Sequence, residues 1–168
     1  MTVALMAACS GPTVHTATYA TLREARASGA VERGWMPDTL PENAYELRAA
    51  YAVDGPERWG LFNFRPADED ALRAILQPDE TSLGGTVMDI PGRIEWWPVI
   101  LRGRLDAERI QTTGMHAYHA RSSPLVFAVN WKQGRAYYWR ESGANVRGAG
   151  RGARVARWGT VRGPTERS

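Results

Sequence analysis

The sequence predicts an α+β fold in which a small antiparallel sheet, built from hairpins, packs with two or three helices. Two pairs of strand-like segments, residues 45–64 and 125–140, are each interrupted by a short turn, a pattern typical of β-hairpins. A segment with helical spacing, residues 66–77, follows the first pair. Separate hairpins and helices favour an antiparallel sheet over a run of parallel βαβ units.

The first expected element is a helix over residues 16–28. Apolar residues recur there at roughly helical spacing, and Gly29 is a natural end for a helix. Residues 34–41 contain two prolines and predict a connector rich in turns.

The first hairpin is expected to pair residues 45–53 with residues 59–64. The turn signal Asp54-Gly55-Pro56 lies between these two strands. Residues 66–77 then predict a helix, because three acids fall in its first turn, where the helix dipole favours negative charge. Pro78 is expected to end that helix.

The middle of the chain gives weaker signals. Residues 79–93 are loop-like, and residues 96–101 fit either a short helix or an apolar packing segment. Residues 105–110 fit one helical turn, and residues 111–118 favour a strand in this context.

The second hairpin joins strands at residues 125–131 and 135–140. Its first strand carries bulky side chains on one face and Val126, Ala128 and Asn130 on the other. We expect the bulky set to face the core, because alternate residues of a strand point to opposite faces. The bulky set is Leu125, Phe127, Val129 and Trp131.

Cys9 is the only cysteine of the 168 residues, and it follows Leu5-Met6-Ala7-Ala8. Small residues directly before a cysteine are typical of the end of a bacterial lipoprotein signal. The sequence therefore predicts a partial lipoprotein signal at residues 1–9, with lipid attached to Cys9, and a short tether at residues 10–15. A basic segment before the apolar run is missing, and a start codon further upstream would supply it. The alternative is a cytosolic protein with an incidental cysteine.

The remaining chain divides into a single globular domain at residues 16–141 and a flexible Arg/Gly-rich tail at residues 142–168. Residues 147–168 hold six arginines against one acid, a net charge of +5, whereas the preceding 146 residues carry a net charge of −2. Nucleic acid is not an expected partner, because binding it requires a basic face on the folded domain, and the positive charge here belongs to the tail. The expected partners are a lipid bilayer, reached through Cys9, and an envelope protein.

Four residues are candidates for binding a partner, because aromatic side chains and arginines are enriched where proteins make contact. Trp96 and Trp97 would form an exposed aromatic patch, although ordinary use in the core is the alternative. Arg151 and Arg154 belong to the basic tail, whose arginines would attract phosphate groups of lipid or an acidic surface.

Several motifs resemble those of a family of uncharacterised bacterial lipoproteins, in order over residues 9–140. The matching segments are residues 32–37 (Glu-Arg-Gly-Trp-Met-Pro), 40–44 (Leu-Pro-Glu-Asn-Ala), 54–64 (ending Phe-Asn-Phe), 128–131 (Ala-Val-Asn-Trp) and 134–139 (Gly-Arg-Ala-Tyr-Tyr-Trp). The resemblance implies export, lipidation and a compact domain. It implies no substrate.

The candidate metal ligands are His116 and His119, and they are weak ones. On a helix, residues three apart share a face, whereas on a strand these two would point to opposite faces. The chain has no His-Glu-x-x-His motif and no Gly-x-Ser-x-Gly motif. We therefore expect no catalytic residues, no bound metal and no cofactor.

The expected function is that of a membrane-anchored lipoprotein of the bacterial cell envelope, facing the periplasm, with a non-catalytic binding or structural domain. One alternative is a periplasmic immunity or inhibitor lipoprotein that blocks a toxin or a hydrolase. A second alternative is an unrecognised hydrolase or metal-dependent enzyme that uses His116 or His119. A third is a cytosolic protein whose basic tail binds nucleic acid.

Overall fold

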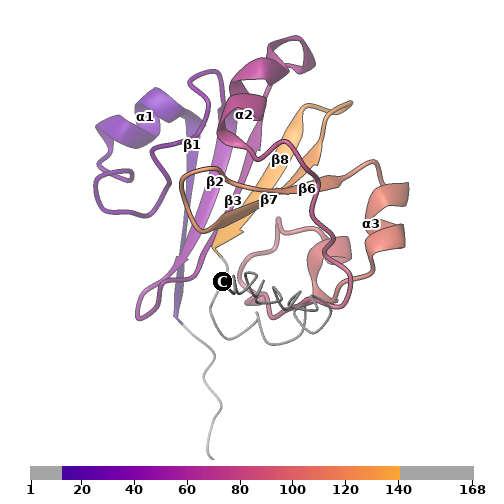
Figure 1. Cartoon of the computed structure of the whole chain (residues 1–168). Helices are drawn as coiled ribbons and strands as arrows, with labels where there is room; N and C mark the ends of the chain where they lie inside the picture. Colours follow the sequence, from indigo (N-terminus) through magenta and orange to yellow (C-terminus); the bar gives the residue numbers. More distant parts are fainter. Residues whose placement is uncertain (1–12, 141–168) are drawn as a thin grey trace, which may run out of the picture.

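The computed structural model describes residues 13–140, which form a six-stranded antiparallel sheet with short helices on both faces (Figure 1). The strand order is β1-β2-β3-β8-β7-β6. Its strands are β1 (Val14–Thr21), β2 (Tyr45–Ala52), β3 (Arg58–Asn63), β6 (His116–His119), β7 (Leu125–Asn130) and β8 (Arg135–Arg140). The sheet therefore consists of two three-stranded meanders that join where β3 pairs with β8.

The other elements are short. A two-stranded sheet pairs β4 (Val87–Met88) with β5 (Gly103–Arg104). The helices are α1 (Leu22–Ala27), α2 (Glu69–Ile75) and α3 (Ala107–Thr112), with single 3₁₀ turns η1 (Pro66–Asp68) and η2 (Val99–Leu101). An α+β class is compatible with this content, but the described part of the chain is mainly β. None of its helices is long and apolar enough to cross a bilayer.

The helix expected over residues 16–28 was wrong in its first half. Residues 14–21 form β1, which pairs with β2 along its length, and only residues 22–27 are helical. The helix begins where the Thr21 side chain accepts a hydrogen bond from the Glu24 amide at 3.2 Å, a typical N-cap. Strand pairing overrides the helical spacing here, and β1 extends to Val14, inside the expected tether.

Most other expected elements are present. Both hairpins form, and the helix expected at residues 66–77 appears as η1 followed by α2. The strand expected at residues 111–118 is shorter, because α3 continues through Thr112 and the strand β6 starts only at His116. Gly114, with φ of +76°, lies in the turn between them.

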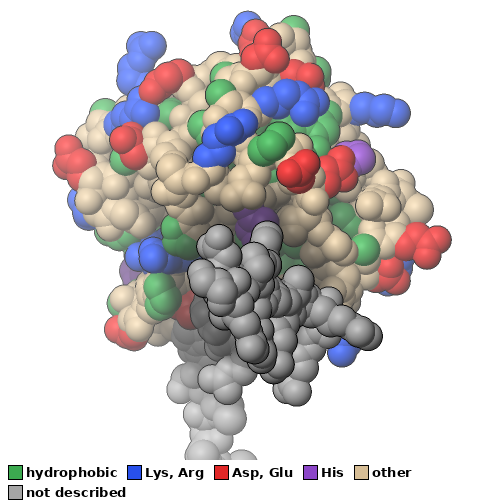
Figure 2. Space-filling view, in the orientation of Figure 1, with side chains coloured by type: hydrophobic (Ala, Val, Ile, Leu, Met, Phe, Trp, Pro, Cys, Tyr) green, Lys and Arg blue, Asp and Glu red, His purple; other side chains and the backbone are tan. Residues whose placement is uncertain are grey.

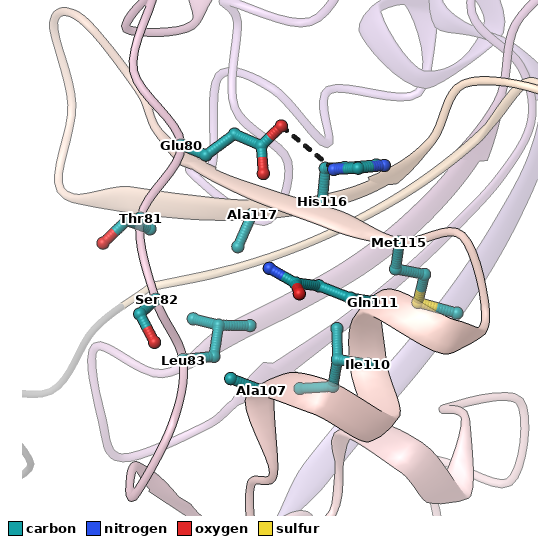
Figure 3. Close-up of a pocket in the computed structure, with 10 residues that line it drawn as sticks. All are labelled: Glu80, Thr81, Ser82, Leu83, Ala107, Ile110, Gln111, Met115, His116 and Ala117. Carbon is teal, nitrogen blue, oxygen red and sulfur yellow. Dashed lines mark ion pairs between the residues drawn. The ribbon is translucent and has the colours of Figure 1, made fainter.

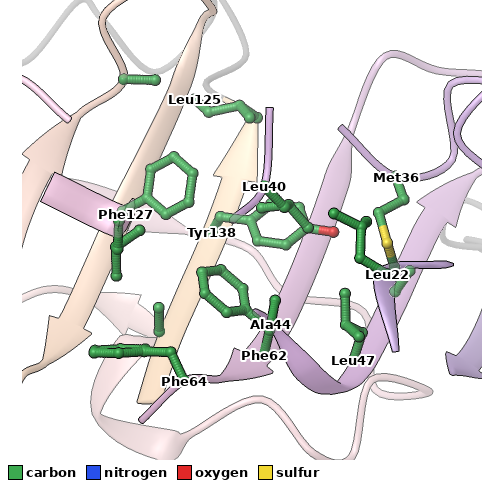
Figure 4. Packing of buried hydrophobic residues seen from close by; sticks show 14 of the residues in the cluster. Leu22, Met36, Leu40, Ala44, Leu47, Phe62, Phe64, Leu125, Phe127 and Tyr138 are labelled. Atoms are coloured by element: carbon green, nitrogen blue, oxygen red, sulfur yellow. The ribbon is translucent and has the colours of Figure 1, made fainter. Parts of the chain in front are cut away.

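The face of the sheet that carries α1 and α2 holds the first core cluster (Figure 4). Phe62, Phe127 and Tyr138 come from three adjacent strands and are fully buried there. The residues that cover them come from α1, α2 and the loop between α1 and β2. These covering residues are Leu22, Ala25, Ala30, Met36, Leu40, Leu72 and Leu76.

The opposite face of the sheet holds a second core cluster, so β7 is buried on both faces, and its bulky set faces the first core cluster as expected. Val126 is 2% exposed and Ala128 is fully buried, just as Phe127 is on the other face. The reason is that residues 83–110 form a second covering layer over this face. Its buried members are Leu83, Met88, Ile94, Trp97, Leu101, Leu105 and Ile110.

Replacing Tyr138 by Phe is expected to raise the free energy of unfolding by about 1 kcal/mol. The Tyr138 hydroxyl is buried without a hydrogen-bond partner in the described range, and burial raises its pKa above the ordinary value. The hydroxyl therefore loses its hydrogen bonds to water on folding and gains none in return. Urea unfolding of the two proteins measures the difference.

The gain from Tyr138→Phe should also grow above about pH 10, where a tyrosine in the unfolded chain ionises. The buried group keeps its proton to higher pH, so Tyr138 lowers the stability of the wild-type protein over this interval, a contribution that the variant lacks. Tyr45→Phe is the control, since Tyr45 is 39% exposed and should give no change. A loss of stability in Tyr138→Phe at pH 7 would contradict the conclusion that the Tyr138 hydroxyl is buried without a hydrogen bond.

Candidate functional site

The two histidines lie on β6, where residues three apart point to opposite faces of the sheet. His116 is on the side of Tyr118 and the first core cluster, whereas His119 is on the other side. They therefore cannot bind one metal ion together. Among residues 13–140, no group of three or more His, Cys, Asp or Glu side chains is placed to hold a metal.

His116 instead contacts a carboxylate. Its Nδ1 lies 3.0 Å from Oε1 of Glu80 (Figure 3). The Tyr118 hydroxyl donates to the same oxygen at 3.3 Å and accepts a hydrogen bond from Nε1 of Trp131 at 3.1 Å. The Arg73 guanidinium lies 4.0 Å from the Trp131 ring centroid. Burial is the main cause that raises the pKa of Tyr118, which keeps its hydroxyl protonated as a donor.

The cavity beside His116 has a volume of only about 20 Å³ and is lined by residues of the 80–83 segment, α3 and β6. That is room for one water molecule and too little for an organic substrate. Residues 77–81 run along the outer edge of β6, where Gln77 and Thr81 each donate a backbone hydrogen bond of 2.8 Å to it. These backbone hydrogen bonds fasten the segment to the edge of the sheet, and the Glu80–His116 contact lies beside them.

A larger hollow lies on the second face of the sheet, beyond the layer formed by residues 83–110. That layer covers Ala50 of β2, Trp59 of β3 and Trp139 of β8. Toward the other end of these strands, exposed and buried residues together surround an open hollow of about 390 Å³. We call this surface the open sheet face, and it comprises Thr18, Ala20, Glu46, Arg48, Leu61, Asn63 and Arg135, beside Tyr19, whose side chain packs in the first core cluster.

Asn63 connects opposite charges across the open sheet face. Its Nδ2 donates to Oε2 of Glu46 at 2.6 Å, and its Oδ1 accepts from Nε of Arg135 at 2.9 Å. Asn63 is 7% exposed, whereas Glu46 and Arg135 are exposed. The acid and the arginine make no ion pair with each other or with any other described residue. The side-chain amide of Asn63 therefore holds the Glu46 carboxylate and the Arg135 guanidinium in place and keeps them apart.

Glu46 has an unusual backbone conformation for this position, with φ of +50°. It lies in a bulge, because the register between β2 and β3 shifts between Tyr45 and Arg48. Bulges of this kind commonly place glycine in the left-handed region. A side chain there is strained, and strained backbone positions cluster at functional sites.

The remaining candidate residues are distributed as follows. Trp97 is 2% exposed, and its Nε1 donates to the Leu101 carbonyl at 2.9 Å, so it belongs to the second core cluster and not to a docking patch. Trp96 is half-buried beside it. Cys9, Arg151 and Arg154 lie outside the described residues.

On the face shown in Figure 2, acidic and basic side chains are interspersed over the upper part of the molecule. They partly offset one another at this surface, so the field is mixed in sign. Local arrangements of charge, such as the Glu46–Asn63–Arg135 row, therefore matter more than any overall field.

Sequence reasoning did not identify the open sheet face. One available signal was Asn63, a polar residue between Phe62 and Phe64 in a strand. A second was the pair Glu46 and Arg48, whose side chains fall on the same face of the expected strand at residues 45–53.

Comparison with known proteins gives one partial match. Residues 13–63 match the model of the YbbD head domain, a bacterial family. This segment contains β1, α1, β2 and β3, and thus Glu46, Arg48 and Asn63 of the open sheet face. No curated protein and no solved structure matches the chain. The first three strands are therefore similar to the YbbD head domain, over less than half of the chain.

Proposed function

We propose that the chain is a non-catalytic binding domain of the bacterial cell envelope, tethered by lipid on Cys9, and that it binds its partner through the open sheet face. The observation that carries this proposal is the Glu46–Asn63–Arg135 row. Opposite charges that are fixed but not neutralised keep free hydrogen-bonding capacity for a partner.

The tether is supported by the sequence before the domain. Cys9 is the only cysteine, and Ala7 and Ala8 precede it. Thr13, the first described residue, follows Cys9 by four positions, which limits their separation to about 14 Å even in an extended chain. Several acyl chains on one cysteine would give stable attachment. The domain would then stay close to the membrane surface.

One experiment tests both parts of the proposal. The full chain is expressed from its own gene with a photo-crosslinking amino acid at Thr18, and membranes are separated before illumination. We expect the protein in the membrane fraction, with an adduct of higher mass at the open sheet face. The matched control places the crosslinker at Val99, which is 83% exposed on the second layer, and should give no adduct.

The two parts have separate readouts. Cys9→Ser should move the protein to the soluble fraction, and a Cys9→Ser protein that stays in the membrane would exclude the lipid anchor. Arg135→Gln should abolish the adduct formed at Thr18 without changing the fraction in which the protein is found. Equal adducts from Thr18 and Val99, or none from Thr18, would exclude the open sheet face as the binding surface.

A further inference from the structure

We infer that the open sheet face binds the C-terminal residue of a peptide, with its carboxylate between Arg48 and Arg135 and its amide N–H on Glu46. This inference rests on the proposed binding face, and it does not depend on the lipid anchor. It follows from the unused hydrogen-bonding groups of three side chains, the net charge of the hollow and the backbone strain at Glu46.

The two arginines supply the donors that a carboxylate needs. Arg135 uses its Nε on Asn63, which leaves both of its Nη groups for a ligand. Arg48 is exposed and makes no ion pair within residues 13–140. Both line the same hollow, on strands that flank β3. A guanidinium matches a carboxylate with two parallel hydrogen bonds, which makes this the favoured anion.

Glu46 supplies an acceptor beside those donors. Its Oε2 takes the hydrogen bond from Asn63, so Oε1 remains for an N–H group of the ligand. The hollow thus holds two positive charges and one negative charge. A ligand with one negative charge and an adjacent donor complements it, whereas a doubly charged phosphate would lie close to the Glu46 carboxylate. The carboxylate and amide of a terminal peptide residue meet this requirement.

The shape of the hollow agrees with a short peptide segment. Its volume of about 390 Å³ falls within the usual range for ligand sites. Leu61, 7% exposed, provides an apolar floor between the charged residues on β2 and β8. A small apolar side chain of the ligand could therefore contact Leu61 while its terminal groups contact the charges.

The backbone at Glu46 argues that this residue is present for its carboxylate. Glycine would adopt φ of +50° without strain and would serve the bulge better. A glutamate there costs stability, and the Asn63 hydrogen bond then fixes the direction of its side chain. Stability alone therefore does not explain Glu46, whereas an acceptor held in one position for a ligand does.

The test is an NMR titration of the full chain carrying Cys9→Ser, with ¹⁵N spectra that include the Asn63 side-chain amide. The probes are Ala-Ala-Ala, the same peptide with a C-terminal amide, Ala-Ala-lactate (an ester in place of the last N–H) and inorganic phosphate. We expect Ala-Ala-Ala to shift Glu46, Asn63 and Arg135. The ester should bind about tenfold more weakly, the loss expected for one charge-assisted hydrogen bond, and the amide should bind more weakly still, because it lacks the charge that both arginines contact.

Variants separate binding from folding. Arg48→Gln and Arg135→Gln should each weaken binding of Ala-Ala-Ala by about tenfold or more, while Arg104→Gln, an exposed arginine on β5, should leave it unchanged. Glu46→Gly should raise the midpoint of thermal unfolding, because it relieves the backbone strain, and should nevertheless weaken binding of the peptide. Glu46→Gln should weaken binding without that thermal gain.

Three results would overturn the inference. They are equal binding of Ala-Ala-Ala and its C-terminal amide, tighter binding of phosphate than of the peptide, and no shift at the open sheet face with any probe. The first two would leave the proposed binding face in place with another ligand. The last, together with a positive crosslink at Thr18, would mean that the face binds a partner through other groups.

Discussion

Gly134→Ala is expected to lower the free energy of unfolding by about 3 kcal/mol. Gly134 has φ of +64°, and a Cβ atom there would lie 2.0 Å from the backbone carbonyl oxygen of Phe64. The two backbones are also joined by a hydrogen bond of 2.7 Å from the Phe64 amide to the Gly134 carbonyl. The clash therefore falls on main-chain atoms where β3 ends, which cannot move aside as a flexible side chain could.

Gly85→Ala is the matched control for this substitution. Gly85 has φ of +80°, but a Cβ atom there would meet nothing within 4 Å. It should cost only about 1 kcal/mol, the penalty for a side chain in the left-handed region. Urea unfolding of both variants measures the difference. Equal losses would mean that the approach of residue 134 to Phe64 adds nothing to the cost.

Trp97→Ala is expected to cost about 3–5 kcal/mol, the usual range for removing a buried aromatic side chain. The indole is 2% exposed and packs edge-on against Tyr137 and Trp139, with ring centroids 5.7 and 6.0 Å away. It is the largest fully buried side chain that joins residues 83–110 to the second face of the sheet. Its removal should therefore loosen this covering layer, while the first core cluster stays packed until a later stage of unfolding.

Two controls distinguish the roles of the neighbouring tryptophans. Trp96→Ala should cost clearly less than Trp97→Ala, because Trp96 is only half-buried. Trp97→Phe should retain part of the packing but leave the Leu101 carbonyl without its indole donor, at a cost of about 1–3 kcal/mol. Amide hydrogen exchange would show whether protection is lost first in residues 83–110. Equal losses from Trp96→Ala and Trp97→Ala would contradict this picture.

The two hairpins could be predicted because alternation and turn residues are local features of the sequence. The strand β1 could not, because Tyr19, Leu22 and Ala25 fit a helical spacing equally well. What decides the outcome is the pairing of residues 14–21 with β2, about thirty residues further on. Within the layer formed by residues 83–110, burial was expected only for an apolar packing segment at residues 96–101, because the short elements of this layer have too little periodicity to signal burial. The bulky face of β7 was therefore predicted correctly, whereas the burial of its second face was not foreseen.

The candidate site escaped prediction for a related reason. Asn63 lies 17 positions from Glu46 and 72 positions from Arg135 along the chain. Their proximity depends on the order of three strands and on one bulge, neither of which a sequence pattern specifies. The histidine pair was different, because a helix would place His116 and His119 on one face and a strand would place them on opposite faces. Once β6 was seen to be a strand, a shared site for His116 and His119 was excluded.

The two edges of the main sheet differ in a way that bears on self-association. The outer edge of β6 is occupied by residues 77–81, which use hydrogen-bonding groups that a further strand would need. Within the described chain β1 pairs only with β2, so its outer edge is the one place where another strand could be added. Growth of the sheet by copies of this protein is thus limited to one side. Two copies could join edge to edge through β1, but a longer row could not form without displacing residues 77–81.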